Sequence, residues 1–372
     1  MGRAVVFELA RAGHPVLVLD REANAARTIA RAFGGGRAHA AAIDARDTGA
    51  LAARLRGARA AAVVNAGPYA FNLTVMAAAL EARCHYLDLG GLFHTTRVQL
   101  THDADFRRAD RLAVLGMGSA PGITNVLARA AADPLLHVRA VRVYNGGADH
   151  TRYEAPVAFG FSAATVLDEF TQPPMVLAGG RFRAAPPLSG GEDVLFDVGL
   201  QHAHLSLHSE VATLPLTYGP KGLRECSFKI AYDPGLVEKL KLLIALGLTA
   251  KEPGPRGVAP RDVLLDCLAA LPRPPAFVDD RDCLAVVVDG DDAEGPLSVR
   301  YDLTAGPQRR PPLSAVARDT GFPPAIVAGL LLAGRIRERG VLPPERCVPV
   351  GPFLEALRAR GMPARVSVTR PA

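Results

Sequence analysis

The amino-acid sequence predicts an α/β protein, with a doubly wound parallel sheet at its N-terminus and an inserted α+β domain after it. Three observations carry this prediction. Strand-length apolar runs alternate with helix-length segments through residues 1–115, which is typical of a parallel sheet covered by helices. After residue 132 the strands alternate in polarity and glycine turns join them, which is typical of antiparallel sheet. Residues 313–339 then return to a helical pattern.

The first twenty residues predict a helix followed by a strand. Gly2 stands before the apolar helix face of Val5–Leu9, Gly13 ends the helix, and Val16–Leu19 is an apolar run typical of a strand buried on both faces. Asp20 closes the strand about 20 residues after Gly2, where a dinucleotide-binding carboxylate accepts a hydrogen bond from the adenosine ribose. The spacing predicts the later part of a Rossmann βαβ unit, with Gly2 as the third glycine of G-x-G-x-x-G.

The residues at the end of this strand favour NAD as the cofactor. The carboxylate of Asp20 would repel a 2′-phosphate, whereas the guanidinium of Arg21 could pair with one, so NADP stays open as the alternative. The first strand of such a unit and its first two glycines do not precede Gly2, and we expect a dinucleotide lobe truncated at its N-terminus. A strand–helix–strand that ends in an acid also occurs in α/β domains without a dinucleotide, and this alternative stays open too.

The alternation of helices and strands continues along the first lobe. Helices are predicted at Ala23–Phe33, around Leu51–Leu55, at Phe71–Ala82 and at Thr95–Ala109, and strands at Ala38–Ile43, Ala60–Val64, Tyr86–Leu89 and Leu112–Leu115. Ligands of doubly wound sheets bind beyond the carboxyl ends of the strands. We therefore expect a cofactor crevice lined by the segments that follow the strands: Asp20, Asp44, Asn65-Ala66-Gly67-Pro68, Asp88–Gly91 and Gly116–Gly122.

The second domain is predicted to mix helices with antiparallel strands. Strands are predicted at Val138–Tyr144, His204–Glu210 and Ser227–Tyr232, hairpins at Gly179-Gly180 and across Asp289–Gly295, and helices at Ala163–Phe170, Leu236–Leu246 and Arg261–Leu271. The helix predicted over residues 313–339 is broken at Gly321-Phe322-Pro323-Pro324 and packs back on the first domain. The predicted domains are residues 1–122, residues 123–312 and the returning residues 313–372.

Composition excludes several classes of protein. The 372 residues suggest about two domains, 49% are hydrophobic, and no apolar run is long enough to predict a membrane span. The net charge of +6 comes mostly from arginines interleaved with acids, so we expect no nucleic-acid partner. The five cysteines have no CxxC spacing, which predicts reduced thiols in the cytoplasm, and no His or Cys cluster predicts a metal site.

Several motifs together resemble one family. They are Tyr86-Leu-Asp-Leu-Gly-Gly91, Gly116-Met-Gly-Ser-Ala-Pro-Gly-Ile-Thr-Asn125, Thr165-Val-Leu-Asp-Glu-Phe-Thr171, His208-Ser-Glu-Val-Ala-Thr-Leu-Pro215 and Ala317-Arg-Asp-Thr-Gly-Phe-Pro323. The chain resembles the saccharopine dehydrogenase family over nearly its whole length, and within it the lysine 6-dehydrogenase branch. Saccharopine-forming members tend to carry an acid where this chain has Ala120, which favours the amine-dehydrogenase branch.

The resemblance implies a dinucleotide lobe, an inserted substrate and dimerisation domain, and a homodimer or higher homo-oligomer. It also implies that the dinucleotide contacts Gly2, Asp20, Asp44, residues 65–68 and the loop of Gly118, Ser119 and Pro121. The implied activity is oxidation of the amine of a small amino acid, foremost L-lysine, to the semialdehyde with formation of NADH. The alternatives are a saccharopine dehydrogenase, a carboxynorspermidine synthase-like imine reductase, or a non-catalytic truncated paralogue that cannot grip pyrophosphate.

Oxidation of an amine requires the neutral amine, whose lone pair drives hydride departure, so a general base with a pKa near neutral is needed. Asp88 follows a parallel strand and is a candidate base or ammonium ligand, with Tyr86 on the same face. The alternative is that Asp88 fixes the glycine turn and Tyr86 is a core residue. His208 and Glu210 share one face of the predicted strand and form a candidate proton acceptor pair, or simply a solvated face.

Candidate substrate ligands lie in the second domain. Asn145 precedes two glycines after a strand and could present its amide to a carboxylate, unless the segment is only a hairpin turn. Phe161 and Ser162 precede a helix, whose N-terminus suits both a serine cap and a carboxylate. Arg152 and Arg224 are candidate carboxylate forks among many arginines.

Overall fold

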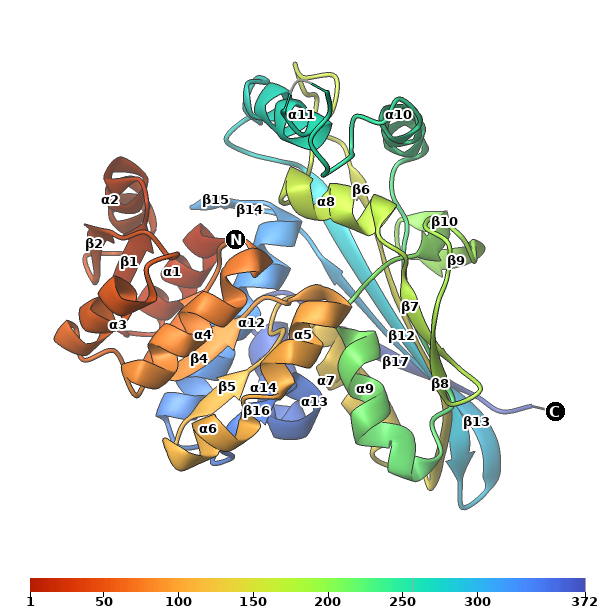
Figure 1. Ribbon diagram of the computed structural model, residues 1–372. Helices are drawn as coiled ribbons and strands as arrows, with labels where there is room; N and C mark the ends of the chain where they lie inside the picture. Colours follow the sequence, from red (N-terminus) through yellow and green to blue (C-terminus); the bar gives the residue numbers. More distant parts are fainter. Residues whose placement is uncertain (256, 372) are drawn as a thin grey trace.

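The computed structural model describes residues 1–255 and 257–371. Figure 1 shows two lobes, an N-terminal lobe of helices around parallel strands and a second lobe built on a long sheet. The C-terminal segment, drawn in blue, runs back among the red and orange elements of the first lobe. This arrangement confirms the predicted α/β class with an α+β lobe inserted before a returning tail.

The parallel strands of the first lobe form two separate sheets in the described part of the chain. One sheet pairs β1 with β2, and the other has the order β16-β5-β4-β3. Their apolar runs made the strands predictable to within two residues at each end. The observed strands are β1 (Val16–Asp20), β2 (Ala38–Ala42), β3 (Ala62–Asn65), β4 (His85–Asp88) and β5 (Leu112–Val114).

Helices cover these strands as predicted, with one difference. The single helix expected at residues 95–109 is two helices, α5 (Leu92–Leu100) and α6 (Asp103–Arg108), because the hydroxyl of Thr101 donates back to the carbonyl of Val98 and ends the first one. The other helices of this lobe are α1 (Gly2–Arg11), α2 (Ala23–Phe33), α3 (Thr48–Gly57), η1 (Tyr69–Phe71) and α4 (Asn72–Glu81). The next helix, α7 (Ile123–Ala132), packs on the sheet of the second lobe.

The second lobe is built on a nine-stranded sheet with the order β17-β13-β12-β6-β11-β10-β9, beside which β7 and β8 attach. Alternating polarity made most of its strands predictable, and the hairpin at Gly179-Gly180 is confirmed. The strands are β6 (His137–Asp149), β7 (Met175–Ala178), β8 (Arg181–Ala184), β9 (Glu192–Phe196), β10 (Gly199–Leu205), β11 (Glu225–Ile230), β12 (Asp280–Asp292), β13 (Gly295–Ala305) and β17 (Ala364–Thr369), with a small pair β14 (Gln308–Arg309) and β15 (Pro312–Leu313).

Helices of the second lobe gather at two places on this sheet. Helix α9 packs with α7 and α12 against one face and closes the main hydrophobic core. The helices α8, α10 and α11 stand together at the end of β6 and β11, at the top of Figure 1. The helices are α8 (Ala163–Thr171), α9 (Glu210–Tyr218), η2 (Gly219–Lys221), α10 (Pro234–Ala245) and α11 (Pro260–Ala269).

Much of the returning tail packs on the first lobe, although β17 near its end pairs with β13 of the second lobe. β16 (Gly340–Leu342) pairs in parallel with β5, and α13 (Pro344–Cys347) and α14 (Val350–Arg358) follow. The predicted break at Gly321-Phe322-Pro323-Pro324 is wrong, since α12 (Ala315–Leu332) runs through both prolines and packs along α1. α12 is long and apolar enough to span a membrane by composition, but 67% of it is buried inside the fold, which is typical of a core helix.

Two predictions about the second lobe are wrong. The alternation at His204–Glu210 is not one strand, because β10 ends at Leu205 and Glu210 begins α9. The segment from Asn145 to Gly147 is not a hairpin turn but lies inside β6, where Asn145 pairs with Leu284 of β12. Gly147 is held there by the side-chain amide of Gln201, which donates to its carbonyl at 2.6 Å and accepts from its N–H at 3.0 Å.

Candidate active site at the junction of the two lobes

The loops that follow the strands of the first lobe meet the second lobe along one junction. Ser209, just before α9, accepts a hydrogen bond from the Gly91 N–H at 3.2 Å and another from the Thr96 hydroxyl at 3.0 Å. Further along, Thr124 at the start of α7 donates to Glu210 Oε1 at 2.8 Å. These contacts join the glycine loops of the first lobe to α9, so that side chains from both lobes face one region.

The predicted adenosine end of the crevice lies at the end of β1 and β2. Asp20 is exposed there, and its Oδ1 accepts from the N–H of Glu22 at 2.8 Å. Arg21 is exposed and pairs with Glu22 at 3.4 Å. Asp44 lies at the same edge, where hydrogen bonds from the side chain and backbone of Arg46 lower its pKa to about 2. Both carboxyl groups therefore lie at the strand ends, where Asp20 is open to solvent.

The next loop fits a dinucleotide that approaches the backbone closely. A Cβ built on Gly2 would lie 3.7 Å from the Cβ of Ala66, so only small groups separate the start of α1 from the loop after β3. Asn65 closes this loop, donating to Asn72 Oδ1 at 2.7 Å and accepting from the Gly67 N–H at 3.1 Å. Pyrophosphate-binding α/β lobes bring small residues together at a helix N-terminus, and Gly2 and Ala66 are close together in the same way.

Asp88 and Tyr86, predicted as candidate catalytic groups, are instead buried in the first lobe. Asp88 is 0% exposed and accepts from the N–H groups of Gly90 and Gly116 at 2.9 and 2.6 Å. The same carboxyl accepts from the hydroxyl of Tyr86 at 2.9 Å and the amide of Gln99 at 2.6 Å. With donors around it on every side, Asp88 fixes the two glycine loops, and this geometry favours the structural alternative for both residues.

The two glycines that Asp88 holds are required by the ring of Pro121. Gly90 and Gly116 have φ angles of +127° and +69°, and a Cβ at either position would come within 2.9 Å or 2.7 Å of that ring. Gly118 in the same loop approaches Thr320 of α12, where a Cβ would meet a side-chain carbon at 3.2 Å. The loop from Gly116 to Gly122 is thus wedged between the strand ends and the returning tail.

Two buried carboxyl groups meet behind this loop. Asp319 of α12 donates to Asp282 of β12, which also accepts from Asn145 Nδ2 at 2.8 Å. Burial raises the pKa of both carboxyls, and the charge of Asp282 raises the pKa of Asp319 further. Ser119 lies beside both, although its Oγ and Asp319 Oδ2 have no partner of normal hydrogen-bond geometry within the described residues. The pair therefore shares a proton at neutral pH.

His208 and Glu210 do contact each other, although not on a strand. The chain turns into α9 between them, and His208 Nδ1 lies 2.5 Å from Glu210 Oε2. The ring of His208 stacks on Phe228 with a centroid separation of 3.7 Å. Burial alone would lower the pKa of His208, but the charge and hydrogen bond of Glu210 outweigh it and raise the pKa above its ordinary value. The contact with Glu210 therefore favours the protonated, ion-paired form of this buried ring.

Sequence reasoning missed Glu169, the carboxyl group that completes this cluster. It lies on α8, and Tyr232 after β11 donates to its Oε2 at 2.5 Å. Burial raises the pKa of Glu169 to about 7, against the opposing influence of His208 and Tyr232. The available signal was the pair Asp168-Glu169 inside an otherwise apolar helix, since charged residues are almost never buried there without partners.

Asp168, the neighbour of Glu169, was also missed. It is buried, and the hydroxyl of Tyr69 donates to its Oδ2 at 2.8 Å. Lys251 and Arg261 approach its Oδ1 at 2.8 and 2.9 Å. Since Pro68 leads directly into η1, which carries Tyr69, this carboxylate connects the predicted dinucleotide loop to helices α8 and α11.

The other predicted substrate ligands are placed differently. Ser162 caps α8, accepting from the Thr165 N–H at 3.4 Å, and Phe161 packs in the apolar cluster beneath that helix. Arg152 is exposed on the segment after β6. Arg224 precedes β11 at the end opposite the junction, and its guanidinium faces the carbonyl of Gly179.

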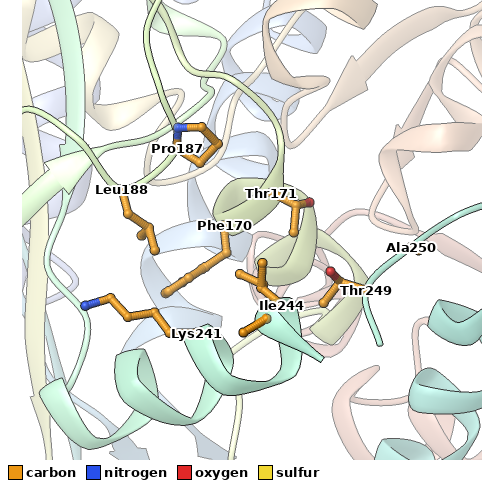
Figure 2. A pocket seen from close by; sticks show the side chains of 9 residues that line it. Phe170, Thr171, Pro187, Leu188, Lys241, Ile244, Thr249 and Ala250 are labelled. Carbon is orange, nitrogen blue, oxygen red and sulfur yellow. The ribbon is translucent and has the colours of Figure 1, made fainter. Parts of the chain in front are cut away.

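A cavity of 490 Å³ lies beside α8 but holds none of the predicted site residues. Figure 2 shows apolar side chains of α8, α10 and the segment between β8 and β9 pointing into it, among them Phe170, Leu188 and Ile244. Lys241 is the one titratable side chain of its lining within the described residues. We therefore assign the chemistry to the titratable cluster at the junction and not to this cavity.

Two family models together match most of the chain. Residues 1–114 match the saccharopine dehydrogenase NADP binding domain, and residues 118–362 match the saccharopine dehydrogenase C-terminal domain. The chain belongs to the saccharopine dehydrogenase family. Membership confirms the resemblance of the sequence motifs and makes this saccharopine dehydrogenase family member an NAD(P)-dependent oxidoreductase of amine or imine substrates.

Two relatives illustrate how the family varies. Carboxyaminopropylagmatine dehydrogenase from Synechocystis sp. is 24% identical over 383 residues, covering 96% of this chain and 92% of that protein. Apo saccharopine dehydrogenase (L-Glu forming) from Saccharomyces cerevisiae superposes with a TM-score of 0.76 at 17% identity, covering 99% of this chain and 98% of that one. The structural likeness confirms the fold of this saccharopine dehydrogenase family member, a Rossmann-like lobe with a second, mixed-sheet lobe.

Proposed function

We propose that this saccharopine dehydrogenase family member oxidises the amine of a small amino acid that carries a second cationic group, with L-lysine as the first substrate and NAD as the acceptor. One observation carries the proposal. Five buried carboxyl groups stand at the junction beside the dinucleotide loops: Asp168, Glu169, Glu210, Asp282 and Asp319. Asp168 faces Lys251 and Arg261, and Glu210 pairs with His208, but within the described residues the other three have no cationic partner. An acidic, partly desolvated junction favours a ligand with more ammonium than carboxylate groups.

Glu169 is the proposed general base. Its pKa, raised to about 7 by burial, leaves it partly ionised at neutral pH, so it can take a proton from the substrate ammonium. Tyr232 orients it, and the ion pair of His208 and Glu210 lies nearby. The nicotinamide, when bound, accepts the hydride from the carbon that bears the neutral amine. Asp20, Gly2, residues 65–68 and the Gly118 loop are the proposed dinucleotide contacts.

A second candidate is the oxidation or formation of a secondary amine on a carboxyaminopropyl chain. It is favoured by the Synechocystis relative, which is named for such a substrate and matches 96% of this chain. A polyamine-like ligand also suits the excess of carboxylates. A saccharopine substrate is less favoured, because Ala120 stands where saccharopine-forming members tend to carry an acid. Homodimer formation and a cytoplasmic location stay predictions from the sequence.

The test is a dehydrogenase assay on the purified chain with NAD and with NADP, following absorbance of the reduced nicotinamide. L-lysine, saccharopine, carboxyaminopropylagmatine and L-norleucine would be compared at equal concentration. We expect turnover with L-lysine and NAD, and none with L-norleucine, which has no second amine. Turnover confined to carboxyaminopropylagmatine would select the second candidate. Failure of every amine, together with no dinucleotide binding by fluorescence titration, would support the non-catalytic paralogue.

A further inference from the structure

Two cations of the second lobe converge on one carboxylate without satisfying it. Lys251 Nζ and Arg261 Nη2 approach Asp168 Oδ1 at 2.8 and 2.9 Å, yet within the described residues that oxygen has no donor of hydrogen-bond geometry. Arg261 Nη2 instead donates to the carbonyl of Ala164 at 2.7 Å. The charged groups are therefore close together, but their N–H groups are poorly aligned with the oxygen. N–H groups of both cations are thus available to another acceptor.

The guanidinium of Arg261 is itself incompletely satisfied. Its side chain is only 7% exposed, and the buried Nη1 has no hydrogen-bond partner among residues 1–255 and 257–371. A buried donor without an acceptor costs about 1–3 kcal/mol, so proteins seldom keep one unless a ligand or water meets it. Lys251 is 54% exposed, which gives an incoming ligand a route from solvent to the same place.

The charges of this cluster do not cancel. Burial alone would raise the pKa of Asp168, but the close contact with Lys251 and the hydrogen bond from Tyr69 outweigh it and hold the pKa below its ordinary value, so the carboxylate stays ionised. Burial and the contact with Asp168 raise the pKa of Tyr69 to about 12, so its phenol stays neutral. Two cations facing one anion leave a net charge of +1 next to a junction that is otherwise acidic.

We propose that Lys251 and Arg261 form a carboxylate-binding subsite, which holds the carboxylate of an amino-acid substrate while Asp168 positions both cations. The proposal rests on the function proposed above, because it assumes an amino-acid substrate. A planar guanidinium and a neighbouring ammonium are a common combination for a carboxylate, and Arg261 Nη1 supplies the unpaired donor. A substrate carboxylate bound at this subsite would lie beside α8, the helix that carries both Asp168 and Glu169, the proposed base.

The subsite predicts a specific discrimination. L-lysine and cadaverine differ only by the carboxylate, so only L-lysine gains from Lys251 and Arg261. The variant Lys251→Met removes the charge and keeps an unbranched side chain. Because the side chain of Lys251 is partly exposed, the substitution should leave the fold intact. Lys241→Met is the matched control, since Lys241 is 48% exposed, pairs with Glu238 at 3.0 Å and takes no part in the subsite.

The experiment measures binding by calorimetry and turnover side by side, with L-lysine, 5-aminopentanoate and cadaverine as probes. We expect Lys251→Met to weaken binding of L-lysine and 5-aminopentanoate about tenfold, raise KM by a similar factor with little change in kcat, and leave cadaverine unaffected. Lys241→Met should match the unmodified protein with all three probes.

The outcomes separate this proposal from the proposed function. Loss of 5-aminopentanoate binding in Lys251→Met without turnover of L-lysine in any variant would support the subsite and reject lysine as the substrate. Normal turnover of L-lysine with an unchanged KM in Lys251→Met would overturn the subsite and keep the function. The subsite is equally overturned if 5-aminopentanoate does not bind the unmodified protein, or if Lys251→Met weakens cadaverine as much as L-lysine.

Discussion

At the scale of single residues, charge states at the junction are set by burial. Glu169 is surrounded by the Tyr232 hydroxyl and the His208–Glu210 pair, and burial raises its pKa to about 7. Burial also raises the pKa of Glu345, on α13, to about 7, but Glu345 accepts a hydrogen bond from Asn125 Nδ2 at 2.8 Å. The two residues are therefore chemically matched, and only Glu169 belongs to the proposed site.

The first prediction concerns Glu169→Gln. An amide of the same shape cannot accept a proton from the substrate ammonium, so kcat/KM should fall by about 100-fold or more. In the unmodified protein kcat/KM should rise as the pH passes through about 7, where Glu169 ionises, and this limb should disappear in the variant. The measurement is a pH–rate profile between pH 5 and pH 9 at saturating dinucleotide.

Glu345→Gln is the control, because ionisation of Glu169 and ionisation of Glu345 change the free energy of unfolding in the same way. A carboxyl whose pKa is raised by folding stabilises the fold at low pH, and that stability is lost as the pH rises towards the folded pKa of about 7. Both variants should therefore lose less stability than the unmodified protein between pH 5 and pH 8, measured by urea unfolding. Equal losses of activity in the two variants would contradict a special role for Glu169.

At the scale of elements, the contact between α1 and α12 decides where the start of the dinucleotide helix lies. A Cβ on Gly321 would meet the Cβ of Ala4 at 2.6 Å and the carbonyl oxygen of Met1 at 3.1 Å, so the two helices touch backbone to backbone there. Gly329, two turns further along α12, would carry a Cβ with its nearest neighbour, His14, at 3.6 Å. The same substitution thus tests close packing at one site and helix propensity at the other.

The second prediction compares Gly321→Ala with Gly329→Ala. The first variant forces α1 and α12 apart and should lower the free energy of unfolding by about 1–3 kcal/mol. It should also weaken dinucleotide binding, because the shift reaches Gly2. Gly329→Ala should be neutral or stabilising by up to about 1 kcal/mol, since alanine is the better helix former. Urea unfolding and dinucleotide titration check both, and similar values for the two variants would refute the argument.

Several elements could be predicted from sequence because their burial leaves a periodic pattern. β1 to β5 are short apolar runs, and β6, β12 and β13 alternate in polarity, so each was found. β17 was not found, although Val366 and Val368 alternate with polar residues. Both valines are exposed, and the strand is held by backbone pairing with β13. α12 was predicted to break because proline lacks an N–H, but packing against α1 and β12 keeps the helix continuous.

The site was predictable only where it depends on local sequence. The dinucleotide loops were found because they follow parallel strands, and His208 and Glu210 were paired correctly although the strand that suggested the pairing is absent. Glu169 and Tyr232 are 63 residues apart, and nothing in either segment identifies the other as its partner. Such contacts arise from tertiary packing, and one sequence gives no information about which distant side chains will meet.

At the scale of the whole molecule, the two lobes meet through a carboxyl pair that needs a proton. Asp319 on the returning tail donates to Asp282 in the sheet of the second lobe, and Asn145 and Ser119 complete the surroundings. Burial raises the pKa of both carboxyls, and Asp280, which caps the start of α12, adds a further negative charge. Ionisation of both members places two like charges across the junction.

The third prediction is that Asp319→Asn stabilises the protein in alkaline solution. The carboxyl pair stabilises the fold at low pH, and that stability is lost as the pH rises through the raised pKa values. The amide keeps the hydrogen bond to Asp282 without a proton to lose, so the variant should lose less stability than the unmodified protein as the pH rises from 6 to 9. Urea unfolding at both pH values measures this, and Asp266→Asn, an exposed site on α11, should leave the pH dependence unchanged.

Tyr69 connects the two proposed ligand sites. It follows the loop after β3 and donates to Asp168, the carboxylate that holds Lys251 and Arg261. If a nucleotide displaced that loop, this hydrogen bond would couple the displacement to the two cations, and a ligand that moved the cations would act on the loop in the same way. Thermodynamic reciprocity then requires each ligand to change the affinity for the other by the same factor, so the order in which they arrive cannot alter the stability of the ternary complex.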